Sequence, residues 1–331
     1  MVAGYGNEMA RLDLFGLLDP GPGSDYGTRG RRSAWLDVDW PAHTHQVEVE
    51  GAPINYVEMG EGPVVMFVHG LGAMWQSWLE NIPELARDHR VIALDLPGFG
   101  RSAMPVEKIT IPHYARLLAC FMDALDIDRA TVIGNSMGGF IGAELAIRDP
   151  ARVERLVLVS PAILWQEYRR AKPLTRLAAV TEASAGRALA TSQGAVATRP
   201  RLRHLGLLLS GFRYPHLLSP ELATEMVRTA RRTKGFVPAL QALADFPLRE
   251  ELPKIAAPTL VVWGAHDPLV HRNHARELDR LIPNVEVAIF ERTGHEAMAE
   301  RPERFHRVLR DFLEATEPYG EAELAGEPAT A

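Results

Sequence analysis

Short runs of apolar residues recur along the chain, and most of them stop at a glycine, a proline or a small polar residue. Runs of this length that are rich in β-branched residues are typical of strands buried on both faces of a sheet. The pattern predicts eight strands, at Gln46–Val49, Ile54–Glu58, Val64–Val68, Val91–Leu94, Thr131–Ile133, Leu156–Val159, Leu260–Trp263 and Val285–Phe290.

Helical stretches separate most of these strands. In Ile111–Leu125 the apolar residues recur at the spacing of one helical face. Alternation of strands and helices predicts an α/β fold, with a mostly parallel central sheet and helices on both of its faces. The two strands that precede Val64 predict an antiparallel lead-in, because only a Gly-Ala-Pro turn separates them.

One long segment breaks the alternation. Between Ala162 and Pro247 no strand-like run occurs, and the sequence is rich in Arg, Leu and Ala, with a net charge of +8. We interpret residues 161–247 as a helical cap, or lid, inserted into a core made of residues 44–160 and 248–316. Residues 1–43 are expected to form a loosely packed N-terminal extension, and residues 317–331 a disordered tail.

Composition limits the classes of function. The 331 residues are 47% hydrophobic and 24% charged, with a net charge of −6, which is ordinary for a globular protein and unsuited to general nucleic-acid binding. The single cysteine excludes an intramolecular disulfide and a thiolate metal cluster. No signal-peptide pattern and no membrane-spanning run is visible, so the sequence predicts a cytoplasmic protein without stable membrane insertion.

The strongest chemical signal is Gly134-Asn135-Ser136-Met137-Gly138-Gly139, which lies between a predicted strand and a predicted helix. A G-x-S-x-G turn in this context is the arrangement of a nucleophile elbow, which exposes the serine hydroxyl. Side chains at Gly134 and Gly138 would clash in so tight a turn. The motif therefore predicts Ser136 as a catalytic nucleophile, and a glycine-rich turn that only packs a helix is the alternative.

A serine nucleophile needs a base and a group that orients the base. Asp267 and His295 each follow a predicted strand, in the order serine, acid, histidine that this architecture uses. Both are predicted to be catalytic. Asp267 could instead cap the next helix, and Asp245 is a weaker rival acid within the cap. His266, His271 and His274 flank Asp267, but no further spacing completes a metal site, and neither a metal nor a cofactor is expected.

The oxyanion of the reaction needs two preorganised donors. The backbone N–H of Met137 is one candidate, and that of Leu71 is the other, with Gly72 as a one-residue alternative. His69 is expected to support this loop rather than to titrate. The residues predicted to contact substrate, for whose aromatic and Met side chains core packing is the competing interpretation, are Gly70, Gly72, Trp75, Asn135, Trp165 and Met298.

Together these motifs resemble the α/β-hydrolase superfamily. The resemblance rests on His69-Gly70-Leu71-Gly72, the stretch Asp95–Ser102, the elbow, Asp267 and Gly294-His295, and it covers residues 46–315. It implies the α/β-hydrolase fold with the cap inserted after the sixth strand. Within the superfamily the stretch Asp95–Ser102 is similar to the esterase, haloperoxidase and carbon–carbon hydrolase branch, where it forms a structural turn beside the site.

The resemblance implies a serine hydrolase that cleaves a small-molecule carboxylic ester through an acyl-enzyme. Haloalkane dehalogenases and epoxide hydrolases carry Asp at the position of Ser136. Carbon–carbon hydrolases of ring-cleavage products (2-hydroxy-6-oxo-dienoate type) are the alternative, since they share the elbow and a basic cap suits an anionic substrate. However, Ala73-Met74-Trp75 and Glu296-Ala297-Met298 stand where those enzymes usually have Pro-Gly and Trp. A non-catalytic ligand-binding scaffold is the third hypothesis. The natural substrate and the oligomeric state, a homodimer included, stay open.

Overall fold

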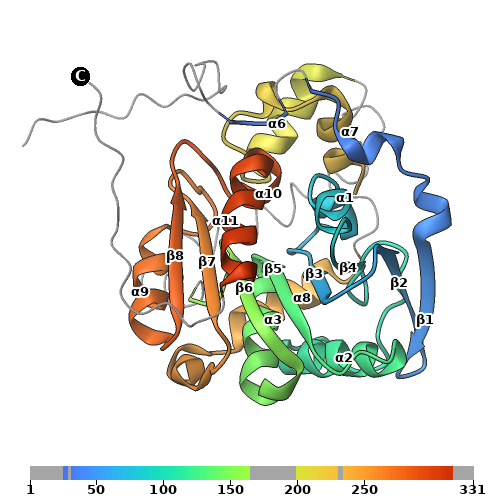
Figure 1. Cartoon of the computed structure of the whole chain (residues 1–331), viewed down its shortest axis with the longest axis vertical. Coiled ribbons are helices and arrows are strands. Elements are labelled where there is room, and N and C mark those ends of the chain that lie inside the picture. Colours follow the sequence, from blue (N-terminus) through green and yellow to red (C-terminus); the bar gives the residue numbers. More distant parts are fainter. Residues whose placement is uncertain (1–24, 29–30, 165–198, 230–233, 316–331) are drawn as a thin grey trace, which may run out of the picture.

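A computed structural model describes residues 25–28, 31–164, 199–229 and 234–315 (Figure 1). All eight predicted strands are present, with ends shifted by up to three residues from the predicted bounds. They form one sheet in the order β1-β2-β4-β3-β5-β6-β7-β8. Their bounds are β1 Thr44–Val49, β2 Ala52–Met59, β3 Val64–Val68, β4 Arg90–Leu94, β5 Ala130–Asn135, β6 Val153–Val159, β7 Thr259–Gly264 and β8 Val285–Phe290.

Strand pairing confirms the predicted fold class. β2 pairs antiparallel with both β1 and β4, which is the antiparallel lead-in, and the pairings from β4 through β8 are parallel. Parallel strands bring their carboxyl ends to one edge of the sheet. The loops that follow β3, β5, β7 and β8 therefore meet at this edge, which is where ligands bind in open α/β sheets.

Apolar residues alternate between the two faces of the sheet and supply two separate cores. In β3, for example, Met66 and Val68 join one core while Val65 and Phe67 join the other. The helices divide in the same way (Figure 1). Helices α2 (Ile111–Ala124), α3 (Met137–Arg148), α8 (Phe236–Asp245) and α9 (Asn273–Leu281) contribute to the first core, and α1 (Ile82–Leu85) and α11 (Pro302–Glu314) contribute to the second.

Helices joined by short turns and loops make up the part of the predicted cap that the structure describes. It contains α6 (Pro200–Leu209), the short turn Pro215–Leu217, α7 (Pro220–Thr229) and α8. Helices α6 and α7 lie at the top of Figure 1, beside α10 (Ala297–Glu300). Trp165 and the predicted tail lie outside the described residues. Within the described ranges, no helix has the length and apolar character needed to cross a bilayer.

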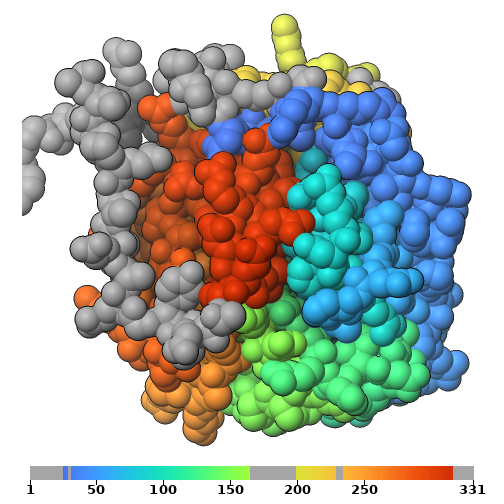
Figure 2. All heavy atoms as spheres, in the orientation of Figure 1, coloured from blue at the N-terminus to red at the C-terminus, as the bar shows by residue number. Residues whose placement is uncertain are grey.

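The predicted N-terminal extension contains two buried aromatic side chains within the part that the structure describes. Tyr26 is fully buried, and Trp35 is only 7% exposed. Trp35 also donates from Nε1 to Glu80 Oε1 over 2.9 Å. The blue N-terminal residues lie directly against the red C-terminal residues in Figure 2. Aromatic side chains spaced among Gly, Pro and charged residues form these contacts, so the local composition concealed them.

Candidate active site

Ser136 lies on a sharp turn between β5 and α3. Its backbone has φ 52° and ψ −112°, a strained conformation for a residue with a side chain. A Cβ atom at Gly134 would overlap the backbone of Gly138, and a Cβ at Gly138 would overlap the carbonyl of Val68. The two glycines are therefore required by close approach of the backbone. The turn has the geometry of a nucleophile elbow.

Asp267 and His295 meet at the same edge of the sheet. His295 Nδ1 lies 2.7 Å from Asp267 Oδ2, and both side chains are buried. The other carboxylate oxygen of Asp267 accepts from the backbone N–H groups of Leu269 (2.8 Å) and Val270 (2.9 Å), which fixes its orientation. Helix α9 begins only at Asn273, so Asp267 is not its N-cap.

The rival acid is far less suited to this role. Asp245 is the last residue of α8 and is exposed to solvent. The carboxylate that pairs with His295 is therefore that of Asp267.

The Asp267 contact sets both the tautomer and the basicity of His295. An ionised carboxylate only accepts hydrogen bonds, so Nδ1 carries the proton and Nε2 is left as the basic nitrogen. Burial alone would lower the pKa of His295, but the charge and hydrogen bond of Asp267, together with the charges of Glu296 and Glu300, raise this pKa above its ordinary value of 6.5. This is the arrangement of a general base held by a second group.

Ser136 and His295 lie on neighbouring loops. Asn135, the residue before the serine, donates from Nδ2 to the backbone oxygen of His295 (3.3 Å) and to that of Val159 (3.3 Å). The Ser136 side chain is partly exposed, and it makes no hydrogen bond to any residue that the structure describes. Catalytic hydrogen bonds are often loose before substrate binds and tighten in the complex.

The loop after β3 lies against the elbow and carries the predicted second oxyanion donor. A Cβ added at Gly70 would lie 3.2 Å from Ser136 Cβ. In the described part of the chain, neither the N–H of Leu71 nor that of Met137, the first residue of α3, has a hydrogen-bond acceptor. Both donors are therefore available beside the serine. Gly72, the one-residue alternative, has φ +78° and faces the Phe236 ring.

His69 supports this loop in a neutral state. Its Nε2 accepts from the backbone N–H of Leu96 over 2.9 Å, so Nδ1 carries the proton and donates to Gly70 O over 2.8 Å. Complete burial lowers the pKa of His69 to about 4. The side chain is uncharged at neutral pH and fixes the loop, as expected from the sequence.

The stretch Asp95–Ser102 is a structural turn. The buried Asp95 carboxylate accepts from the side chain of Asn55 (2.9 Å) and from the backbone N–H groups of Trp75 (3.1 Å) and Arg101 (2.9 Å). Ser102 Oγ donates to Asp95 O over 2.6 Å. These bonds hold the turn against Trp75, which follows the β3 loop. The turn therefore supports that loop.

The residues predicted to contact substrate have mixed surroundings. Met298 is fully buried in α10, and Trp75 is 7% exposed and packs against Trp40 with ring centroids 4.9 Å apart. Asn135 is buried and ties the elbow to the histidine loop. Contact of any of these residues with substrate stays a prediction.

Sequence reasoning missed one buried carboxylate at the site. Glu300 accepts from the backbone N–H groups of Gly294 (3.0 Å) and Glu296 (3.2 Å), which flank His295 on both sides. It also accepts from the N–H of Arg213 over 2.9 Å and from the hydroxyl of Tyr26. The only signal in the sequence was an acidic residue five positions after the histidine.

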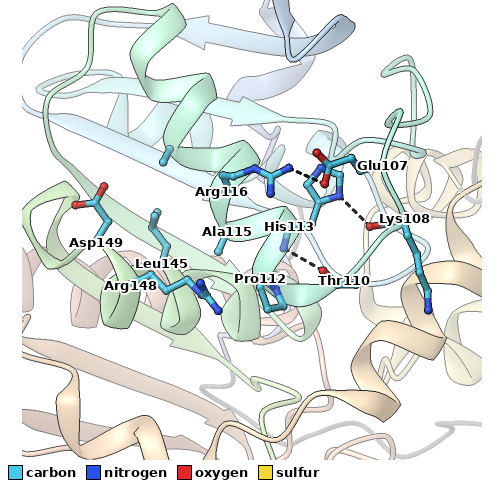
Figure 3. A pocket seen from close by; sticks show the side chains of 11 residues that line it. Glu107, Lys108, Thr110, Pro112, His113, Ala115, Arg116, Leu145, Arg148 and Asp149 are labelled. Atoms are coloured by element: carbon cyan, nitrogen blue, oxygen red, sulfur yellow. Dashed lines mark hydrogen bonds and ion pairs between the residues drawn. The ribbon is translucent and has the colours of Figure 1, made fainter.

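A surface pocket of about 470 Å³ lies elsewhere (Figure 3). It is lined by the start of α2 and the end of α3, where Arg148 is about 16 Å along the helix from Met137. Arg116, which lines this pocket, is paired with Glu50 and Glu107. The pocket is separate from the candidate site. No cluster of His, Cys, Asp or Glu suited to a metal ion occurs among the described residues.

A serine on a strand–helix turn, a histidine paired with aspartate and a doubly wound sheet define a hydrolase architecture. Residues 63–302 match the alpha/beta hydrolase fold family. The chain belongs to this family and is a hydrolase, as the sequence motifs indicated.

The similar proteins are named as different kinds of hydrolase. The 2-hydroxy-6-oxo-6-phenylhexa-2,4-dienoate hydrolase of Burkholderia cepacia is 30% identical, over 78% of this chain and 91% of that protein. The enol-lactonase structure from Burkholderia xenovorans LB400 is 26% identical with a TM-score of 0.68, covering 82% of this chain and 100% of that one. A bacterial membrane phospholipase A structure is 30% identical with a TM-score of 0.63, covering 82% and 85%.

Proposed function

We propose that the protein is a serine hydrolase that cleaves a carboxylic ester of a small molecule through an acyl-enzyme. The observation that carries the proposal is the buried 2.7 Å pair of Asp267 and His295, on the loops beside the strained turn of Ser136. The proposal needs no cofactor, because the nucleophile, its base and both oxyanion donors come from the chain itself.

The reaction would proceed in two halves. His295 Nε2 removes the Ser136 proton as Oγ attacks the ester carbonyl carbon, and Asp267 stabilises the imidazolium that forms. The N–H groups of Met137 and Leu71 bind the oxyanion. The imidazolium returns its proton to the leaving alcohol. A water molecule, deprotonated by the same histidine, then releases the acid and restores the serine.

Two similarities favour an ester or lactone as the substrate. The enol-lactonase and phospholipase A named above cleave acyl–oxygen bonds by their printed names, and both cover most of this chain. The residue after His295 is the partly buried Glu296, and the loss of hydration around its carboxyl raises its pKa to about 7. When the Glu296 carboxyl is ionised, its negative charge repels the carboxylate of a dienoate substrate.

Carbon–carbon hydrolysis is the second candidate. It is favoured by the 30% identity to the Burkholderia cepacia dienoate hydrolase, and by the elbow sequence Gly134–Gly139, which resembles that of ring-cleavage hydrolases. A series of nitrophenyl esters of increasing acyl length, compared with a 2-hydroxy-6-oxo-dienoate, separates the two. We expect kcat/KM for the best ester to exceed that for the dienoate. The reverse order would assign the protein to carbon–carbon hydrolysis.

Replacement of the nucleophile tests the chemistry. Ser136→Ala is expected to lower kcat for a nitrophenyl ester by at least about 10³-fold, because no other group can form the acyl-enzyme. Circular dichroism should show an unchanged fold. Ser77→Ala, at a buried serine outside the site, is the matched control and should keep its activity.

Retained turnover in Ser136→Ala would refute the assignment. Covalent labelling of Ser136 by a fluorophosphonate tests the non-catalytic alternative, since a scaffold that only binds ligand would not react.

A further inference from the structure

A short N-terminal segment, residues 25–28, lies outside the region that matches the family and yet reaches the histidine loop. Tyr26 in this segment is fully buried. In Figure 1 the segment is the short blue stretch beside α6, close to α10. Its two neighbours are the loop that carries His295 and the chain that follows α6.

Tyr26 joins these two neighbours through its hydroxyl. The hydroxyl donates to Glu300 Oε2 and accepts from the backbone N–H of Tyr214 over 2.8 Å. The ring packs edge-on against the ring of Tyr214, with centroids 5.4 Å apart. The Arg301 guanidinium lies over the Tyr26 ring, 5.5 Å from its centroid. A single phenol therefore bridges two segments that are far apart in the sequence.

Further bonds hold residues 25–28 in place. The N–H of Gly27 donates to Glu300 O over 2.7 Å, and Asp25 forms an ion pair with Arg301. The residues before and after Tyr26 are therefore both held in place, and they fix the position of the phenol. Because the Tyr26 side chain is already immobilised, its hydrogen bond to the Glu300 carboxylate costs little additional conformational entropy.

Glu300 transmits this restraint to the histidine. Its carboxylate holds the N–H groups of Gly294 and Glu296, the residues on either side of His295. The N–H of His295 itself donates to Gly211 O over 2.9 Å, on the same post-α6 chain that Tyr214 belongs to. The backbone N–H groups of Gly294 and Glu296 thus bond to Glu300, and that of His295 bonds to the chain after α6. The Tyr26 hydroxyl is bonded to both of these partners.

We infer that Tyr26 is a positioning residue for His295: residues 25–28 form an N-terminal strap that fixes the histidine loop through Glu300 and joins it to the chain after α6. The inference rests on the proposed function, since it assigns His295 as the base. A nucleophile and base must be held close to productive geometry, and small displacements are costly for rate. The strap supplies part of that precision from outside the family's common core.

Tyr26→Phe tests the inference, because it removes the hydroxyl and keeps the ring. We expect kcat for a nitrophenyl ester to fall about tenfold while KM changes less than twofold, since misalignment of the base affects the chemical step. The rate of fluorophosphonate labelling at Ser136 should fall in parallel. The final extent of labelling should match the wild type, which shows that the folded fraction is unchanged.

Thr259→Val is the matched control. It also removes one buried hydroxyl that donates a hydrogen bond, to Ala257 O over 2.9 Å, but it does so at the start of β7, at the opposite edge of the sheet. A merely structural role for Tyr26 would give both variants similar losses of thermal stability and an unchanged kcat per labelled site. That outcome would overturn the inference.

The test separates failure of the strap from failure of the proposed function. If the wild-type protein neither hydrolyses the ester nor reacts with the fluorophosphonate, the proposed function fails, and the strap inference fails with it. If the wild type reacts and Tyr26→Phe keeps the wild-type kcat, only the strap inference fails. A fall in kcat in Tyr26→Phe but not in Thr259→Val supports it.

Discussion

At the scale of single residues, the site concentrates acidic groups around one imidazole. Asp267, Glu296 and Glu300 all raise the pKa of His295, while burial lowers it. Burial in turn raises the pKa of Glu296 to about 7, and its Oε2 has no hydrogen-bond partner among the described residues. Glu296 therefore changes charge in the pH range where a histidine base would operate.

The pH dependence of activity follows from these charges. The imidazole acts as a base only when neutral, so kcat/KM should fall as pH drops through the pKa of His295, at a midpoint above 6.5. Glu296→Gln removes a negative charge that stabilises the imidazolium, so the midpoint should move to lower pH. A pH profile of nitrophenyl ester hydrolysis measures the shift.

The control for this experiment is Glu291→Gln, because Glu291 is exposed on the same loop. Its profile should match that of the wild type. An unmoved midpoint in Glu296→Gln would mean that Glu296 exerts no field on His295.

At the scale of elements, the elbow depends on the contact between β5, α3 and β3. The backbone of Gly138 approaches the carbonyls of Val68 and His69 too closely for a Cβ atom. Gly142, one turn further along α3, meets only the side chains of Val132 and Leu156 at 3.2 and 3.3 Å. Both positions are glycines of α3, but only at Gly142 can the neighbouring atoms adjust to admit a side chain.

Gly138→Ala should therefore lower the free energy of unfolding by at least about 2 kcal/mol, because backbone atoms must move to admit the methyl group. Urea unfolding measures the change. Gly142→Ala is the control on the same helix, and it should cost less, since flexible side chains can adjust and alanine favours the helix. Equal losses in the two variants would contradict the close-approach argument.

The elements themselves were predictable from local pattern. Buried parallel strands need continuous apolar runs, so β3 and β8 match their predicted bounds, and the residues that follow strand ends lie at one edge of the sheet by topology. The pairing of Asp267 with His295 follows from that rule. The bond from Tyr26 to Glu300 does not, because it spans 274 residues and no periodicity marks either partner.

At the scale of the whole molecule, the described residues before β1, 25–28 and 31–43, place aromatic side chains against the core. Trp35 is buried against α1 and its neighbours, and Trp40 packs on Trp75 behind the β3 loop. Tyr26 lies farther along the same surface, at the histidine loop. The described residues before β1 therefore contact both Trp75, which follows the β3 loop, and Glu300, which holds the histidine loop.

Trp35→Ala is expected to lower the free energy of unfolding by about 3 kcal/mol, because it empties a buried aromatic site and leaves Glu80 without one donor. The measurement is urea unfolding, with kcat per fluorophosphonate-labelled site as the second readout. That kcat should stay at the wild-type value, since Trp35 touches neither the serine nor the histidine loop. Unchanged stability would mean that the N-terminal packing contributes little to the fold.

The carbonyl of Gly211 has a mechanical consequence. It is bonded to the N–H of His295, and a Cβ at Gly211 would lie 2.6 Å from that of the histidine. The chain between α6 and α7 is thus bonded to the backbone of His295. Any side chain larger than hydrogen at Gly211 would therefore press on His295 itself, so a substitution at the end of α6 reaches the proposed base directly.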